Sequence, residues 1–151
     1  MSVKVKGLAK ALRDIDRKSE SIQNAVIEVL ADTASAIDFD AKTNAPYELG
    51  GQVLGVKGKI RAVPISKFNY KVEIRDPQDF DAYAEFGTGQ NASQILNGPG
   101  YTVEMRAIAR EFYKNGQGTL IGQPFLFPAW IKHTANILEE LRIELNKASK
   151  K

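Results

Sequence analysis

Hydrophobic residues in the first third of the chain recur at steps of three and four, which is the spacing of one face of an α-helix. No proline or glycine lies between Leu8 and Ala45, so the pattern predicts a helix of roughly 35 residues, about 50 Å long. Such a helix exceeds what one small domain can cover, and we expect part of its apolar face to find another surface. The stripe comprises Leu8, Leu12, Ile15, Ile22, Val26, Val29, Ala34, Ile37 and Ala41.

Proline and glycine mark where this helix ends and where loops follow. Asn44-Ala45-Pro46 stops the helix, because the residue before a proline is pushed toward extended geometry. Residues 47–58 and 87–102 each contain four glycines. Both segments are therefore predicted to be flexible loops.

Alternating apolar and polar residues predict strands between these two loops. Lys59–Ile65 reads as one strand, in which Pro64 marks a sheet edge or the end of the strand. The alternation over Phe68–Ile74 is the clearest sign of a half-buried strand. A similar alternation over Phe80–Phe86 follows a turn at Asp76-Pro77. We expect these last two strands to form an antiparallel hairpin.

The C-terminal part reads as helical. Val103–Lys114 has a helical apolar side, and Asn115-Gly116 is a suitable stop. A last helix is expected to run to about Ala148, with Pro128 in its first turn. Its apolar stripe consists of Trp130, Thr134, Ile137, Leu138, Leu141 and Leu145.

Together these elements predict an α+β fold in a single domain, residues 1–151. It has a long N-terminal helix, a small antiparallel sheet of two to four strands, a short helix, and a C-terminal helix packed on the sheet.

Composition narrows the class of protein without defining a partner. No apolar run approaches the length needed to span a bilayer, so no membrane is expected. Cysteine is absent, which excludes disulfides and thiolate chemistry. The 21 basic and 18 acidic residues nearly balance, leaving a formal charge of +3. That excess permits weak attraction to nucleic acid but does not predict it. The basic residues gather at the termini, as Lys4, Lys6, Lys10, Arg13, Arg17, Lys18, Lys147, Lys150 and Lys151.

Residues suited to catalysis are few, and we expect neither an enzyme nor a cofactor. His133 is the only histidine and is expected at the surface or in a capping role. No nucleophile elbow or phosphate-binding loop motif occurs. Asp76, Asp79, Asp81 and Glu85 form an acidic set that could bind a divalent cation, but their spacing matches no known cation loop. An acidic strand edge, solvated or facing a partner, is the better interpretation.

Three segments, in this order, resemble one protein family. Ala45-Pro46 with Gly50-Gly51 and Leu54 is similar to its A-P-x-x-T-G-x-L element, although Glu48-Leu49-Gly50 replaces the usual acid-Thr-Gly. Tyr83-Ala84-Glu85-Phe86-Gly87-Thr88 is similar to its Y-A-x-x-x-E-x-G-T element. Gln123-Pro124-Phe125-Leu126-Phe127-Pro128-Ala129 is similar to its x-P-F-L-x-P-A element. The family is that of the tail-completion and neck (head-tail joining) proteins of long-tailed double-stranded DNA bacteriophages.

The resemblance implies a structural virion protein, made in the host cytoplasm, at the junction of head and tail. It implies a homo-oligomeric ring, of the order of six or twelve copies, closed by cyclic symmetry. The other partners implied are a head-side adaptor or stopper protein, a tail terminator or tail-tube protein, and DNA contacted without sequence specificity. Residues 47–58 and 87–102 are then expected to become ordered on assembly.

The matching residues are the candidates for assembly contacts. Pro124 and Pro128 bracket three apolar side chains, which can plug into a neighbour or dock the last helix within the same chain. The full set is Ala45, Pro46, Gly50, Leu54, Tyr83, Glu85, Phe86, Gly87, Thr88, Pro124, Phe125, Leu126, Pro128 and Ala129. Two alternatives remain: a tail terminator ring, or a small basic nucleic-acid-binding domain.

Overall fold

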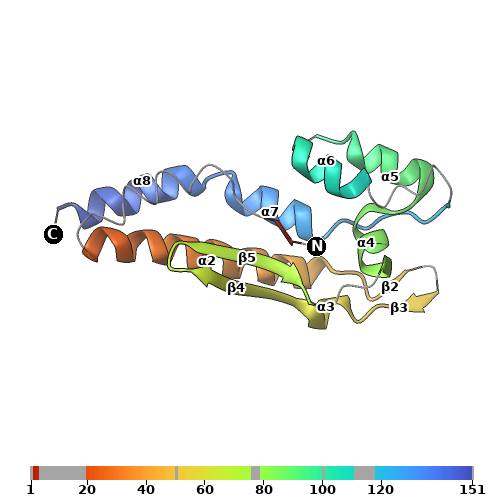
Figure 1. Cartoon of the computed structure of the whole chain (residues 1–151), viewed down its shortest axis with the longest axis horizontal. Helices are drawn as coiled ribbons and strands as arrows, with labels where there is room; N and C mark the ends of the chain where they lie inside the picture. Colours follow the sequence, from red (N-terminus) through yellow and green to blue (C-terminus); the bar gives the residue numbers. More distant parts are fainter. Residues whose placement is uncertain are drawn as a thin grey trace.

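The fold is α+β, as predicted, with a long helix, a small antiparallel sheet and several shorter helices (Figure 1). The computed structural model describes residues 2–3, 20–49, 51–75, 79–99, 101–110 and 118–150. The elements are β1 (Ser2–Val3), α2 (Glu20–Asn44), β2 (Glu48–Leu49), β3 (Gln52–Val53), α3 (Val56–Lys59), β4 (Ile60–Ser66), β5 (Asn69–Ile74), α4 (Asp79–Phe86), α5 (Gly89–Leu96), α6 (Val103–Arg110), α7 (Leu126–Thr134) and α8 (Ile137–Ala148).

Helix α2 is the spine of the molecule. Its 25 residues extend about 37 Å at 1.5 Å per residue, and it ends just before the buried Pro46. The predicted part of this helix over residues 8–19 lies outside the described residues. Helices α7 and α8 lie along one side of α2, and the β4–β5 hairpin lies along another (Figure 1). The buried side chains of α2 are Val26, Val29, Leu30, Thr33, Ala34, Ile37 and Ala41, so all but Thr33 and Leu30 belong to the predicted stripe.

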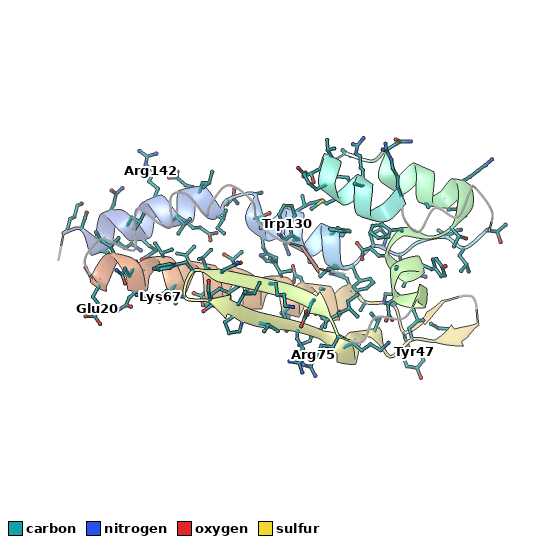
Figure 2. The ribbon with its side chains drawn as sticks, viewed as in Figure 1. Glu20, Tyr47, Lys67, Arg75, Trp130 and Arg142 are labelled. Atoms are coloured by element: carbon teal, nitrogen blue, oxygen red, sulfur yellow. The ribbon has the colours of Figure 1, made fainter. Side chains whose placement is uncertain are left out.

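The main sheet has the order β1-β5-β4, with both pairings antiparallel. Strand β4 is at the edge, as Pro64 predicted, and the register between β4 and β5 shifts just after that proline. Ile60, Val72 and Ile74 are buried on the face toward α2. Arg75 points away from α2 on the outer side of the hairpin (Figure 2).

Two contacts hold the C-terminal helices against α2. Helix α8 buries Ile137 and Leu141 against Val26, Val29 and Leu30, and Phe68 and Tyr70 of the hairpin pack on the same cluster. On α7, the Nζ of Lys132 and the Nε2 of His133 lie 2.6 Å and 2.7 Å from the Oδ2 of Asp40 on α2. Mainly through the hydrogen bond from Lys132, the two side chains keep the pKa of Asp40 below its usual value. The lone histidine therefore ties two helices together.

The predicted strand over Phe80–Phe86 is wrong, because residues 79–86 form helix α4. The hairpin is instead formed by β4 and β5. Every residue from 81 to 89 is buried, the polar Asp81 and Glu85 included, so the alternation in this segment does not separate a buried face from a solvated one. Ala82 and Ala84 favour a helix by intrinsic propensity.

Several other predicted elements differ in detail. The segment 47–58 contains the β2–β3 hairpin and the start of α3, and the segment 87–102 contains α5. The last helix is two helices, which break at Ala135-Asn136. Val103, placed on the apolar side of its helix by the pattern, is 80% exposed, whereas Met105 is buried.

Candidate functional site

The three segments that carry the family resemblance meet in one hydrophobic cluster. Leu54 comes from the first segment, Tyr83 and Ala84 from the second, and Phe125, Leu126 and Ala129 from the third. They pack with Ile37 and Ala41 of α2 and with the inner side of the hairpin, and the half-buried Ala45 adds to the cluster. Segments up to about 80 residues apart in the chain thus form one core, as expected when contiguous packing buries apolar surface.

Glu85 is the centre of this region and is fully buried. Its Oε2 accepts hydrogen bonds from the backbone N–H groups of Phe125 (2.8 Å) and Leu126 (2.9 Å). Its Oε1 accepts a third from the N–H of Phe127 (3.0 Å). These three residues begin α7, so Glu85, at the end of α4, caps a helix that starts 41 residues later. We call Glu85 with residues 120–127 the Glu85 junction.

The sequence explains why α7 needs a cap from elsewhere. The first four N–H groups of a helix have no partner within the helix, and a Ser, Thr, Asp or Asn at the N-cap usually accepts from them. Here the N-cap is Phe125, whose side chain makes no capping bond. The fourth position is Pro128, which has no N–H. Glu85 accepts hydrogen bonds from the first three N–H groups, and Pro128 has no N–H to satisfy. No N–H group at the start of α7 is therefore left without a partner.

Opposing effects act on the charge of Glu85. Burial raises its pKa to about 7, while the three backbone hydrogen bonds act in the opposite direction. The N-terminus of α7 also favours a negative charge. Burial, with a smaller contribution from Glu85, raises the pKa of the nearby Tyr101 as well. The ring centroids of Phe86 and Tyr101 lie 5.4 Å and 6.1 Å from that of Phe127. Three aromatic side chains thus pack together at the junction.

A backbone ladder next to Glu85 fixes the path of the chain into α7. Thr88 N–H donates to the carbonyl of Leu120 (3.0 Å), and the N–H of Leu120 donates to the Thr88 hydroxyl (3.0 Å). Gln123 N–H donates to the carbonyl of Ala84 (2.7 Å). Gly87 sits between them with φ +73°, and a Cβ there would lie 2.5 Å from the nitrogen of Gly122. Only glycine allows the two backbones to approach this closely.

The candidate assembly residues are thus mostly internal. Pro46, Leu54, Tyr83, Glu85, Phe86, Gly87, Thr88, Phe125, Leu126 and Ala129 are buried within the chain. Ala45 and Pro124 are half-buried, Pro128 is exposed, and Gly50 lies outside the described residues. Phe125–Phe127 could either insert into a neighbour or dock the last helix within the same chain. In the structure they are buried within the same chain. A direct contact with a neighbour through most of these side chains would require them to leave this core.

The acidic set does not form a strand edge. Asp81 is buried on α4, with its Oδ2 3.0 Å from the Nζ of Lys59. Asp76 lies outside the described residues, and nothing is described of the Asp79 side chain. Among the residues that the structure does describe, no group of three or more metal-ligating side chains could hold an ion. No helix in the described ranges is long and apolar enough to cross a membrane.

The capping role of Glu85 was missed from the sequence, although a signal existed. A helix beginning Phe125-Leu126-Phe127 has no capping residue of its own, which indicates that an acceptor comes from another segment. Comparison of the chain with models of known families, with curated proteins and with solved structures found no match.

Replacing Glu85 should destabilise the fold strongly. Glu85→Leu removes the acceptor and leaves three buried N–H groups without a partner, each costing about 1–3 kcal/mol. We expect a loss of at least about 3 kcal/mol in the free energy of unfolding, measured by urea titration at pH 6. Glu85→Gln keeps one carbonyl oxygen and should lose less. Glu48→Gln, at an exposed acid, is the control; a loss below about 1 kcal/mol for Glu85→Leu would refute the cap.

The pKa of Glu85 predicts a pH dependence of stability. The unfolded carboxyl ionises near 4.5 and the folded one near 7. Between these values the folded state holds a proton that the unfolded state has lost, so stability is greatest below pH 4.5 and falls as pH rises through 7. The decrease should approach about 3 kcal/mol, from 1.36 kcal/mol per pKa unit. Glu85→Gln should lack this decrease, and parallel profiles for the two proteins would contradict the assignment.

Gly87→Ala tests the close approach of the two backbones. The positive φ costs about 1–2 kcal/mol for a residue with a side chain, and contact with backbone atoms adds to it. The control is Gly58→Ala, since a Cβ at Gly58 meets nothing within 4 Å. Thermal unfolding should show a clear loss for Gly87→Ala and no loss for the control. A melting temperature of Gly87→Ala equal to that of the wild type would mean that the backbone ladder tolerates a side chain at this position.

Proposed function

We propose that this protein is a structural subunit of the neck of a long-tailed bacteriophage, a tail-completion or head-tail joining protein that forms a ring between the head connector and the tail tube. The observation that carries the proposal is the meeting of the three resembling segments. Motifs that match by chance have no reason to share a core, whereas here they pack together around Glu85.

The form of the Glu85 junction supports a structural role for the motifs. Three residues of the second and third motifs help to hold α7 in place: Glu85 caps it, Gly87 allows the close approach, and Pro128 fits its first turn. Motif residues that hold the fold together suit a subunit that acts through its shape. The motifs are therefore features of a structural subunit.

Exposed apolar side chains supply surface for assembly. Among the residues that the structure describes, six large apolar residues besides Val103 are exposed by between 44% and 75%, several of them remote from the motifs. Scattered exposed apolar residues are common in monomers, but in a ring subunit they are natural contact points. They are Phe39, Tyr47, Ile65, Ile121, Leu138 and Ile143. Tyr47 and Arg142 lie toward opposite ends of the molecule (Figure 2).

The test is genetic and uses the phage that carries the gene. A stop codon early in the gene should leave filled heads and tails that do not join, as seen by electron microscopy of lysates. Wild-type protein supplied in trans should restore joined particles, and so should Gly58→Ala. Glu85→Leu should not, because its fold is destabilised.

Other outcomes separate the alternatives. Normal joined particles without the protein would refute the proposal. Tails of irregular length would favour the tail terminator. If the isolated monomer bound DNA with an affinity that falls steeply with salt, and particles assembled without it, the nucleic-acid-binding class would be favoured instead.

A further inference from the structure

The β4–β5 hairpin and the short helix α3 before it are strongly basic. Residues 57–75 hold six basic residues and one acidic residue, a net charge of +5. The other 132 residues hold 15 basic and 17 acidic residues, a net charge of −2. The positive excess of the whole chain therefore comes from this one segment. Its basic residues are Lys57, Lys59, Arg61, Lys67, Lys71 and Arg75.

The pleat of the strands places basic side chains on the face of the hairpin that points away from α2. Ile60 and Ile74 are buried toward α2, so Arg61 and Arg75, which follow them in the strands, lie on the outer face. Both are exposed, and so is Lys67 in the turn. Lys67 and Arg75 lie toward opposite ends of the hairpin (Figure 2). Positive charge thus follows the length of β4, about 24 Å for its seven residues.

Four of the six cations are not neutralised by any acid in the described part of the chain. Lys71 pairs with Glu73, the one acid of the segment. Lys59 lies 3.0 Å from the Oδ2 of Asp81. The remaining four take part in none of the salt bridges formed among the described residues. We call these four, Lys57, Arg61, Lys67 and Arg75, the hairpin cations.

The contacts that two of the hairpin cations do make are with neutral groups. The Nη1 of Arg61 donates to the carbonyl of Ile60 at 2.7 Å, and the Nζ of Lys67 donates to the side-chain oxygen of Gln23. Both side chains therefore keep a full positive charge. Each also keeps donors to spare, since a guanidinium has five N–H groups and an ammonium has three. A partner that supplies negatively charged oxygen acceptors would satisfy both needs.

The chemistry of this face fits a nucleic acid better than a protein. Charged residues are depleted at the core of protein interfaces, whereas here they are spread along the whole face. Double-stranded DNA carries one negative charge per about 1.7 Å of its axis. A face about 24 Å long therefore spans on the order of fourteen phosphate charges.

The shape of the sheet favours B-form DNA among nucleic acids. The major groove of B-DNA is about 12 Å wide and admits a two-stranded β-ribbon, whereas the major groove of an RNA duplex is deep and narrow. The sheet is two-stranded over most of its length, because β1 adds only Ser2 and Val3 beside β5. Helix α2 covers only the inner face of the hairpin (Figure 1).

We propose that the outer face of the β4–β5 hairpin lies across the major groove of double-stranded DNA and binds phosphates on its two sides through the hairpin cations. Contacts to phosphates carry no sequence information, so the binding is independent of sequence. This inference goes beyond the proposed neck role. Only the use of the surface in a ring, where it would meet DNA that passes from head to tail, rests on that role.

Binding of the full chain to a labelled duplex of about 20 base pairs, followed by fluorescence anisotropy, tests this surface. Contacts to four phosphates predict a slope of about −3.6 for the logarithm of the binding constant against that of the salt concentration, which is a loss of about 100-fold between about 50 and 200 mM salt. A second duplex of different sequence should give the same curve. A wild type that does not bind at about 50 mM salt would overturn the proposal.

Removing the charges should flatten this dependence. Arg61→Gln with Lys67→Gln and Arg75→Gln leaves one hairpin cation, so the slope should fall to about −0.9. Affinity at about 50 mM salt should fall at least about tenfold. Thermal unfolding verifies that the triple variant is folded. Arg61→Gln alone, a change at an exposed side chain, should reduce the slope by about 0.9 and gives a second measure that does not depend on the triple variant.

A variant of equal net charge is the control. Arg142→Gln with Lys147→Gln and Lys150→Gln also removes three exposed cations, in and just after α8. It should keep the slope and most of the affinity of the wild type. An equal loss in the two triple variants would mean that net charge and not the hairpin face binds DNA, which would overturn the proposal.

Competition with unlabelled polymers decides the class of partner. Duplex DNA should displace the label at concentrations at which polyglutamate of the same total charge and an RNA duplex of the same length do not. Equal competition by polyglutamate would favour an acidic protein surface, and equal competition by RNA would contradict the fit to the major groove. Either result would overturn the proposal.

The two proposals fail separately. A protein that does not bind DNA would leave the neck role, which is tested on particles, as it is. Normal joined particles without the protein would refute the neck role and leave the DNA-binding surface, which is measured on the isolated chain, as it is.

Discussion

The structure depends on the buried carboxyl group of Glu85 and on the three backbone N–H groups that donate hydrogen bonds to it. Helix α7 begins with Phe125-Leu126-Phe127, a sequence with no side chain able to cap it, and its start lies in a core from which water is excluded. Unpaired N–H groups there would each cost about 1–3 kcal/mol. Glu85 removes that cost only if α4 ends at one place relative to α7. The geometry of this cap thereby determines how two distant parts of the chain are joined.

The rest of the C-terminal half follows from that constraint. With the start of α7 fixed by Glu85, the hydrogen bonds of Asp40 with Lys132 and His133 hold α7 along α2. Helix α8 then buries Ile137 and Leu141 near the other end of α2. The C-terminal helices are thus held at three places: by Glu85 on α4, by Asp40 on α2, and by the apolar cluster near the start of α2. Polar contacts act at the first two, and apolar packing acts at the third.

The sequence predicted elements well where one face of an element is polar. The alternation over residues 68–74 located β5, and of the two meanings open for Pro64, a sheet edge or the end of the strand, the structure has the edge. The spacing of Val26, Ile37 and Ala41 located the buried face of α2. The prediction failed over residues 80–86, because residues 81–86 of α4 are all buried, the polar Asp81 and Glu85 included, and periodicity needs a contrast between a buried and a solvated face. The break at Ala135-Asn136 has no proline or glycine to announce it.

The candidate site shows what a motif resemblance can and cannot establish. It selected residues that belong together, because Leu54, Tyr83 and Leu126 do share a core. It did not distinguish a residue needed for folding from one that contacts a partner, since a match of residue types carries no information on burial. Burial makes that distinction. Most side chains of the motifs are engaged within the chain, so in the proposed ring the contacts between copies would belong to other surfaces, such as those that carry the exposed apolar side chains. For the proposed ring subunit this separation would be a physical advantage, because the groups that complete the core of each copy would not be the groups that its neighbours must reach.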